Sequence, residues 1–164
     1  RRERVTSAMR PRGESAANQH RIVSWRTGWR IIQAHPWFGL GPEHVKLQFD
    51  EYVPADVPRP LPTGWYGHLH TIYLHYSAER GVPTLLALLW LLGKILLDFA
   101  RAARRAPPAQ RFLLHGGVAV VLAMLAEGIF ELNLGDTEVL TVFLSIVAAG
   151  YVAIETAAEE TAVA

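Results

Sequence analysis

Three histidines stand close together directly before a long apolar segment: His68, His70 and His75. A histidine side chain can serve as a general base or as a hydrogen-bond donor at neutral pH. Titratable side chains are costly to keep at the edge of a membrane, so their clustering here indicates a functional site. For each histidine taken alone, the simpler alternative is that it caps a helix or satisfies a backbone group.

The spacing of His68 and His70 also raises the alternative of a metal site, because an extended strand would place both imidazoles on one metal ion. Apart from His75, no Asp, Cys or His follows at a familiar ligand spacing. We therefore favour a site with no metal and no other cofactor, and we keep a metal-dependent membrane hydrolase as a weaker alternative.

Further polar residues follow the histidines. The ring of Tyr73 suits the membrane–water interface, which favours a structural role for it over a catalytic one. Glu79 and Arg80 precede Gly81, where they form either an interfacial ion pair or part of the site. We include His68, Tyr73 and Glu79 among the candidate substrate-binding residues.

Arginines on an earlier segment supply a second kind of chemistry. Arg21, Arg26 and Arg30 carry planar guanidinium groups that can hold phosphate oxygens in pairs. On a helix at a bilayer surface, their natural anionic target is a lipid phosphate or diphosphate. For any one of them, a solvated basic face is the alternative.

Two carboxylates lie near the end of a later apolar segment. Glu127 and Glu131 are one helical turn apart, and Asn133 and Asp136 follow. Carboxylates at the edge of a membrane usually line a polar cavity. We expect Glu131 to bind sugar hydroxyls or to counter the arginines.

The elements that must position these residues follow from an uneven composition. Residues 1–60 contain ten Lys or Arg and six acids, whereas residues 82–154 hold most of the Leu, Val and Ala. This indicates a polar segment joined to a membrane bundle, and we expect further helices upstream. There are no cysteines, so disulfides and thiolate chemistry are excluded. The net charge of +1 does not identify a partner, and we expect membrane lipids and no nucleic acid.

The polar segment is expected to be helical with tight turns. Ile22, Trp25, Trp29 and Ile32 recur at helical spacing, which predicts an amphipathic helix that ends before Pro36. This helix lies either at the membrane surface or against its own domain. Two glycines and two prolines in residues 36–42 predict a structured turn. Residues 45–52 are expected to form a short helix, and the prolines of residues 54–62 an extended connection.

Three apolar segments predict transmembrane helices at about residues 82–100, 112–130 and 138–154. Residues 85–92 and 118–126 are apolar on every face, whereas a soluble bundle would need a polar stripe. The fold class is therefore expected to be an all-α integral membrane protein. It combines a helical loop region, residues 1–81, with three membrane helices and a frayed tail, residues 155–164.

The connections between these helices predict their orientation. The connection between the first two carries four arginines, a strong cytoplasmic signal: Arg101, Arg104, Arg105 and Arg111. The connection over residues 131–138 is acidic and is expected outside. Residues 1–81 are then extracytoplasmic, the histidine cluster faces outward, and the tail is cytoplasmic.

The order of these features resembles the C-terminal half of the O-antigen ligase and polymerase family of bacterial membrane glycosyltransferases. The motifs that carry the resemblance are Arg21-x-x-x-Trp25, His35-Pro36-x-x-Gly39-x-Gly41-Pro42, His68-Leu69-His70-Thr71-x-Tyr73-Leu74 and Glu79-Arg80-Gly81. Two positions depart from the family pattern. Thr71 stands where Asn is common, and Thr84 stands where the Glu-Arg-Gly-x-Pro stretch of the family often continues with Gly. Because Thr71 can still cap a helix or form a hydrogen bond, we interpret it as a variant.

The resemblance implies a GT-C-type enzyme of the bacterial inner membrane with a large periplasmic loop. Its donor would be a polyprenyl-diphosphate-linked glycan. Its acceptor would be lipid A–core in a ligase, or another lipid-linked glycan in a polymerase. Transfer would be metal-independent and inverting. A non-enzymatic membrane scaffold or transport module is the alternative from another class.

The resemblance also suggests roles for individual residues. His70 matches the histidine of the family's His-Asn pair, and Arg21 matches the arginine before the tryptophan. Our hypothesis is that His70 is the general base and that Arg21 stabilises the leaving diphosphate. His68 and Arg26 are second candidates.

Overall fold

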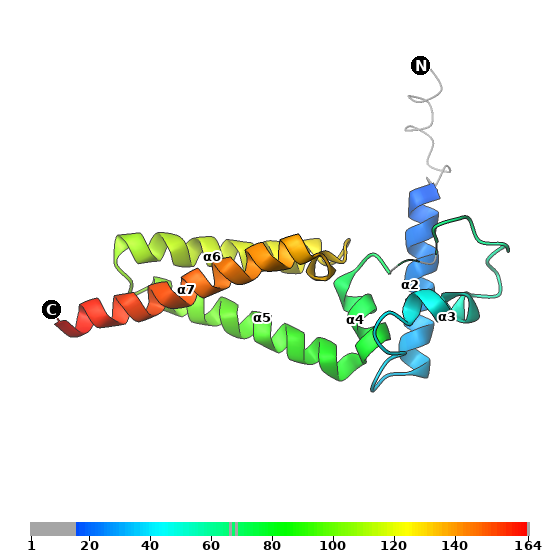
Figure 1. Ribbon diagram of the computed structural model, residues 1–164, viewed down its shortest axis with the longest axis horizontal. Helices are drawn as coiled ribbons and strands as arrows, with labels where there is room; N and C mark the ends of the chain where they lie inside the picture. Colours follow the sequence, from blue (N-terminus) through cyan, green and yellow to red (C-terminus); the bar gives the residue numbers. More distant parts are fainter. Residues whose placement is uncertain (1–15, 66, 68, 164) are drawn as a thin grey trace, which may run out of the picture.

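The computed structural model describes residues 16–65, 67 and 69–163, and all regular structure in these ranges is helical. Figure 1 shows three long helices that lie along one another and a smaller unit across one end of them. The smaller unit contains α2 (Ala16–Ala34), α3 (Val45–Tyr52) and α4 (Ile72–Arg80). The long bundle contains α5 (Val82–Ala103), α6 (Pro108–Glu127) and α7 (Thr137–Val163), with the short 3-10 helix η1 (Asn133–Gly135) before α7.

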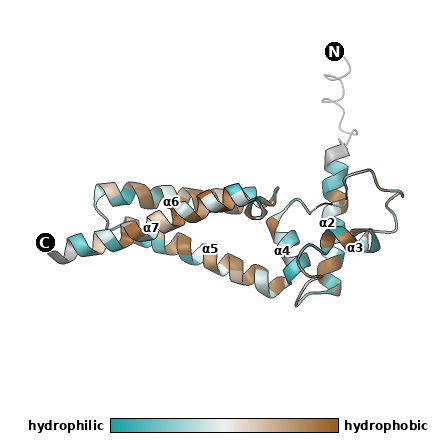
Figure 2. Ribbon diagram, in the orientation of Figure 1, coloured by the Kyte–Doolittle hydropathy of each residue, from teal (hydrophilic) through white to brown (hydrophobic). Residues whose placement is uncertain are grey.

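The three long helices are membrane helices. Val82–Ala103, Pro108–Glu127 and Thr137–Glu160 are long enough to cross a bilayer, with mean hydropathies of 1.8, 1.5 and 1.9. No more than 22% of the apolar stretch of any of them is buried against the rest of the protein. Figure 2 shows the apolar residues distributed around α5, α6 and α7. A soluble bundle would leave this surface in water, so the prediction of an all-α membrane protein is confirmed.

Several helix ends differ from those expected from the sequence. The first membrane helix continues past residue 100 to Ala103. The second begins at Pro108 and ends at Glu127, because proline is well accommodated in a first helical turn and the chain turns at Gly128. The third continues through the tail of residues 155–163, which we expected to fray. Its Ala- and Glu-rich sequence has high helix propensity.

Helix α2 packs on its neighbours with a different face from the one predicted. The predicted stripe is mostly exposed, and Trp29 is 57% exposed. The buried side instead carries Val23, Thr27 and Ile31. Val23 and Ile31, together with Ile32 of the predicted stripe, join a core shared with α3 and α4. The tryptophan side of α2 is therefore partly exposed, which is compatible with a helix that packs on its own domain and also contacts a membrane surface.

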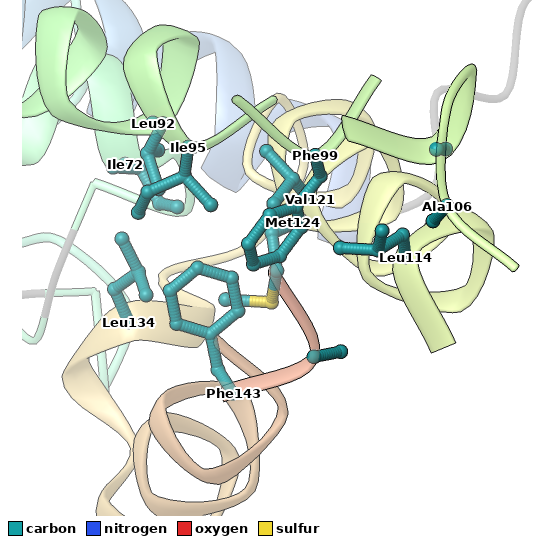
Figure 3. Close-up of a cluster of buried hydrophobic side chains, with 12 residues drawn as sticks. Ile72, Leu92, Ile95, Phe99, Ala106, Leu114, Val121, Met124, Leu134 and Phe143 are labelled. Atoms are coloured by element: carbon teal, nitrogen blue, oxygen red, sulfur yellow. The ribbon is translucent and has the colours of Figure 1, made fainter. Parts of the chain in front are cut away.

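The bundle is held together by Phe99 of α5, which is fully buried where the three long helices meet (Figure 3). The neighbouring helices approach its ring through glycines. A Cβ atom at Gly117 of α6 would lie 2.6 Å from the ring, and one at Gly150 of α7 would lie 2.3 Å from it. Small residues allow membrane helices to approach closely, and here they make room for one aromatic side chain.

This packing predicts opposite effects for two adjacent glycines. A Cβ atom at Gly116 would meet nothing within 4 Å, whereas one at Gly117 would overlap Phe99. Alanine favours a helix over glycine by about 1 kcal/mol at either position. We expect Gly116→Ala to keep or raise the thermal unfolding temperature of the protein in detergent. Gly117→Ala should lower this temperature, because the overlap with Phe99 reduces the free energy of unfolding by a net amount of about 1–2 kcal/mol. Equal unfolding temperatures for the two variants would contradict this packing.

Candidate functional site

The candidate site begins where the first turn of α4 meets the last turn of α6. The backbone N–H of Ile72 and the hydroxyl of Thr71 both donate to the carbonyl oxygen of Gly128, each at 2.9 Å. The hydroxyl of Tyr73 donates to the carbonyl oxygen of Leu125 at 2.6 Å. Helix ends leave N–H and C=O groups without partners inside the helix. Here the start of one helix supplies donors to the end of another.

This junction explains two of the residues singled out in the sequence. Thr71 stands at the N-cap position of α4, yet its hydroxyl bonds across to α6 and does not cap its own helix. Tyr73 is a structural donor, in line with the role we favoured for it. Burial raises the pKa of its hydroxyl above the ordinary value of 10.0, so the proton that it donates is retained at neutral pH.

The junction also places His70, which directly precedes the two donors. His70 adopts φ = 51°, a left-handed conformation that turns the chain. Its half-buried ring has Nδ1 3.8 Å from Oε2 of Glu131, an ion-pair distance when the imidazole is protonated. His70 does not adopt the extended backbone from which the alternative of a shared metal ion was argued. His68, the other candidate, lies outside the described residues.

Glu131 joins this histidine to an arginine. Its Oε1 lies 3.5 Å from Nη2 of Arg21 on α2, and its Oε2 faces His70. The three side chains come from α2, from the turn before α4 and from the turn after α6. Glu131 therefore counters Arg21, one of the two roles expected for it. Because both Arg21 and Glu131 remain about half exposed, this pair adds little to stability.

Two residues at this site were missed by sequence reasoning. The ring of His20 stacks on Trp65 with centroids 4.9 Å apart, and it meets the ring of His70 edge-on at 4.8 Å. His20 directly precedes Arg21, but successive side chains on a helix point in different directions. Its position next to a candidate arginine therefore gave no signal that both would reach the same site.

A cavity of about 450 Å³ lies beside Glu131. It is lined by carboxylates and an amide, namely Glu127, Glu131, Asp136 and Asn133. Asn133 is buried, and its amide nitrogen lies 3.5 Å from Oε2 of Glu127. Glu127 and Glu131 thus line one cavity, and Leu132 and Val139 add apolar walls to it.

Arg26 and Glu79 lie apart from this group. Arg26 forms a two-pronged hydrogen bond with Asp56, at 2.8 and 2.7 Å, which ties α2 to the proline-rich connection. Glu79 is buried at the opposite end of α4 from His70. Its Oε1 accepts from the backbone N–H of Glu43 at 2.9 Å and lies 3.4 Å from Nε2 of His75. The ion pair with Arg80, one of the two alternatives for Glu79, is not formed, and Arg80 lies over the ring of Tyr76.

The glycine-rich turn of residues 36–42 closes this second end of α4. The backbone N–H groups of Leu40 and Gly41 donate to the carbonyls of Ala78 and Glu79, both at 2.8 Å. Gly39 has φ = 64°, and a Cβ atom there would lie 2.4 Å from the carbonyl carbon of Glu79. The glycine-rich turn and the Glu79-Arg80-Gly81 motif, which stand far apart in the sequence, therefore pack directly against each other.

Glu79 makes stability depend on pH. Burial raises the pKa of its carboxyl above the ordinary value of 4.5 and outweighs the hydrogen bond from Glu43. The folded protein then holds this proton more tightly than the unfolded chain. Glu79 thus contributes most to stability below pH 4.5, and that contribution is lost as the pH rises through the raised pKa.

We expect Glu79→Gln to gain stability relative to the wild type as the pH rises from about 4.5 to 7. The glutamine keeps an oxygen that can accept from Glu43 but carries no charge. Thermal unfolding in detergent across this range measures the difference. Glu51→Gln, at an exposed position of α3, serves as the control and should show no such trend. A difference for Glu79→Gln that stays constant with pH would contradict the assignment.

Residues 1–89 match the model of a family described as O-antigen ligase. No curated protein matches the chain. The matched stretch includes Arg21, His70 and all of α2, α3 and α4, whereas Glu131 lies beyond it.

Proposed function

Because the chain belongs to the O-antigen ligase family, which supports a membrane glycosyltransferase role in O-antigen or polysaccharide assembly, we propose that it is a ligase. It transfers a glycan from a polyprenyl-diphosphate carrier to lipid A–core at the outer face of the inner membrane. The observation that carries this proposal is the position of Glu131, whose carboxylate stands between Arg21 and His70.

The reaction needs a base and a group that stabilises the departing diphosphate. His70 takes the proton from an acceptor hydroxyl as its oxygen attacks the anomeric carbon. The bond from that carbon to the diphosphate breaks, and its electron pair leaves with the diphosphate, whose charge Arg21 stabilises. Glu131 is a positioning residue in this scheme, because its charge favours the imidazolium that His70 becomes. The attack from the side opposite the diphosphate inverts the anomeric centre.

The surroundings support a separation of the two substrates. The cavity beside Glu131 is lined by carboxylates and an amide, which suit the hydroxyls of a sugar and repel a diphosphate. Arg21 and the exposed tryptophans of α2 lie where an anionic lipid carrier would approach. Arg26 is a second candidate for the diphosphate, although its pairing with Asp56 must first open. Of the other candidates, His68 follows Gly67 in the chain and would bind substrate beside His70. Tyr73 and Glu79 would support the site indirectly, because both hold α4 in place.

The arginines between α5 and α6 support the proposed orientation. Arg101, Arg104 and Arg105 lie at the end of α5, far from His70 along the bundle. Positive charge of this kind remains cytoplasmic. Residues 1–81 would then lie in the periplasm, where the glycan is available on its carrier.

The role of His70 predicts that His70→Ala loses transfer. The full-length protein in detergent is incubated with a polyprenyl-diphosphate-linked oligosaccharide and lipid A–core, and glycolipids are resolved on a gel. We expect at least about a hundredfold loss of glycosylated lipid A–core for His70→Ala, the effect of removing a general base. His115→Ala, exposed on α6, serves as the control and should retain activity.

Other products would change the proposal in defined ways. Full transfer by His70→Ala would exclude His70 as the base. Longer lipid-linked chains, in place of modified lipid A–core, would make the protein a polymerase. A wild-type protein that makes neither product would favour a scaffold or transport role.

The positioning role of Glu131 predicts a split between two kinetic constants. We expect Glu131→Gln to lower kcat by about tenfold. The carboxylate of Glu131 favours the imidazolium form of His70, and a neighbouring charge of this kind changes the stability of the charged form by about one pKa unit, or a factor of ten. KM for the diphosphate-linked donor should stay the same or fall, because Arg21 no longer has a competing carboxylate. Glu138→Gln, at an exposed position of α7, is the control. A raised KM for lipid A–core with unchanged kcat would instead make Glu131 a sugar-binding residue.

A further inference from the structure

A second cavity lies at the other end of the bundle, between α5 and α7. It has a volume of about 570 Å³ and lies at the C-terminal end of α5, whereas His70 lies before α4, which leads into the start of α5. Three arginines line one side of it, the first in α5 and the others directly after that helix: Arg101, Arg104 and Arg105. Ala102, Tyr151 and Ile154 form an apolar wall. Figure 1 shows the end of α5 and the last turns of α7 at this same end of the molecule.

The three arginines in the cavity wall outnumber its one carboxylate, Asp98, so the cavity carries an excess of positive charge. None of these three arginines forms a side-chain hydrogen bond or an ion pair within the part of the chain that the structure describes. The one carboxylate in the cavity wall belongs to Asp98. Asp98 is already engaged by Lys94, and it accepts a hydrogen bond from the hydroxyl of Tyr151 at 3.1 Å. Asp98 interacts with Arg101 only at longer range, so the N–H donors of the guanidinium groups are available to an external anion.

The position of the cavity indicates which anion it takes. Its residues lie where the apolar part of α5 ends, which is the level of the lipid headgroups. Leu97 and Val152, next to the cavity residues in sequence, are 50% and 60% exposed and belong to the apolar surface of the bundle. A phospholipid can place its phosphate on the arginines and its acyl chains along this surface, whereas a free phosphate would leave the apolar wall unused.

We infer that this cavity binds the headgroup of an anionic phospholipid. Guanidinium groups bind phosphate oxygens in pairs, and basic pockets between membrane helices are suited to anionic headgroups. The site is separate from the one that contains His70, so lipid binding here does not depend on the proposed transfer reaction.

The inference is tested by native mass spectrometry of the full-length protein in detergent. Phosphatidylglycerol or phosphatidylcholine is added, and bound lipid is counted. We expect the wild type to retain phosphatidylglycerol in preference to phosphatidylcholine. The double variant Arg101→Gln/Arg105→Gln should bind phosphatidylglycerol at least about tenfold more weakly. Lys46→Gln/Arg59→Gln removes the same charge from the α3 region and should bind as the wild type does.

A second variant covers the possibility that loss of two arginines alters folding or orientation. Ala102→Phe keeps every charge but fills the cavity, and it should also lose the preference for phosphatidylglycerol. Equal binding of both lipids to the wild type, or an unchanged preference in Ala102→Phe, would overturn the inference. Displacement of phosphatidylglycerol by millimolar inorganic phosphate would identify a free-phosphate site instead.

Discussion

The mutual capping of α4 and α6 is the interaction on which the candidate site depends. The N–H of Ile72 and the hydroxyl of Thr71 converge on the carbonyl of Gly128, at the end of a membrane helix. Within or near a bilayer, an unpaired carbonyl is costly because little water is available to it. The junction satisfies groups from both helices at once. It also fixes the residues on either side of it, His70 before α4 and Glu131 after α6.

The opposite end of α4 is closed by the same physical means. Backbone donors of residues 40 and 41 reach its last carbonyls, and buried Glu79 accepts from the N–H of Glu43. Helix α4 is only 9 residues long and would be unstable alone, so its position is set by what caps it. The glycine motifs and the histidine motif, which are far apart in sequence, thus serve one short helix. Substitutions in the turn of residues 36–42 or at Gly81 are therefore expected to alter the position of His70, because both hold α4 in place.

The elements were largely predictable, because their signals are local. The membrane helices follow from length and hydropathy, and α3 has the predicted bounds, Val45–Tyr52. The packed face of α2 was not predictable, because apolar residues occur on more than one side of this helix. Sequence alone does not say whether Trp29 meets protein or lipid. Its exposed position becomes clear only once α3 and α4 cover the side of Ile31.

The candidate site was predictable residue by residue but not as a constellation. His70, Arg21 and Glu131 were each identified from residue type and position, yet nothing local indicated that one carboxylate would contact both of the others. Glu79 was expected either to pair with Arg80, its neighbour in sequence, or to form part of the site. Adjacent side chains on a helix do not face each other, so Glu79 instead points inward to the turn after Pro42. His20 and Trp65 reach the site only through the fold.

The central claim is that a diphosphate-linked glycan meets its acceptor between Arg21 and His70. A cryo-EM structure of the full-length protein with a polyprenyl diphosphate analogue that cannot transfer its sugar tests it directly. The account predicts the diphosphate in contact with the guanidinium of Arg21, with the anomeric carbon on the side of His70. Density for the diphosphate among Arg101, Arg104 and Arg105, with the region around Arg21 empty, would contradict it.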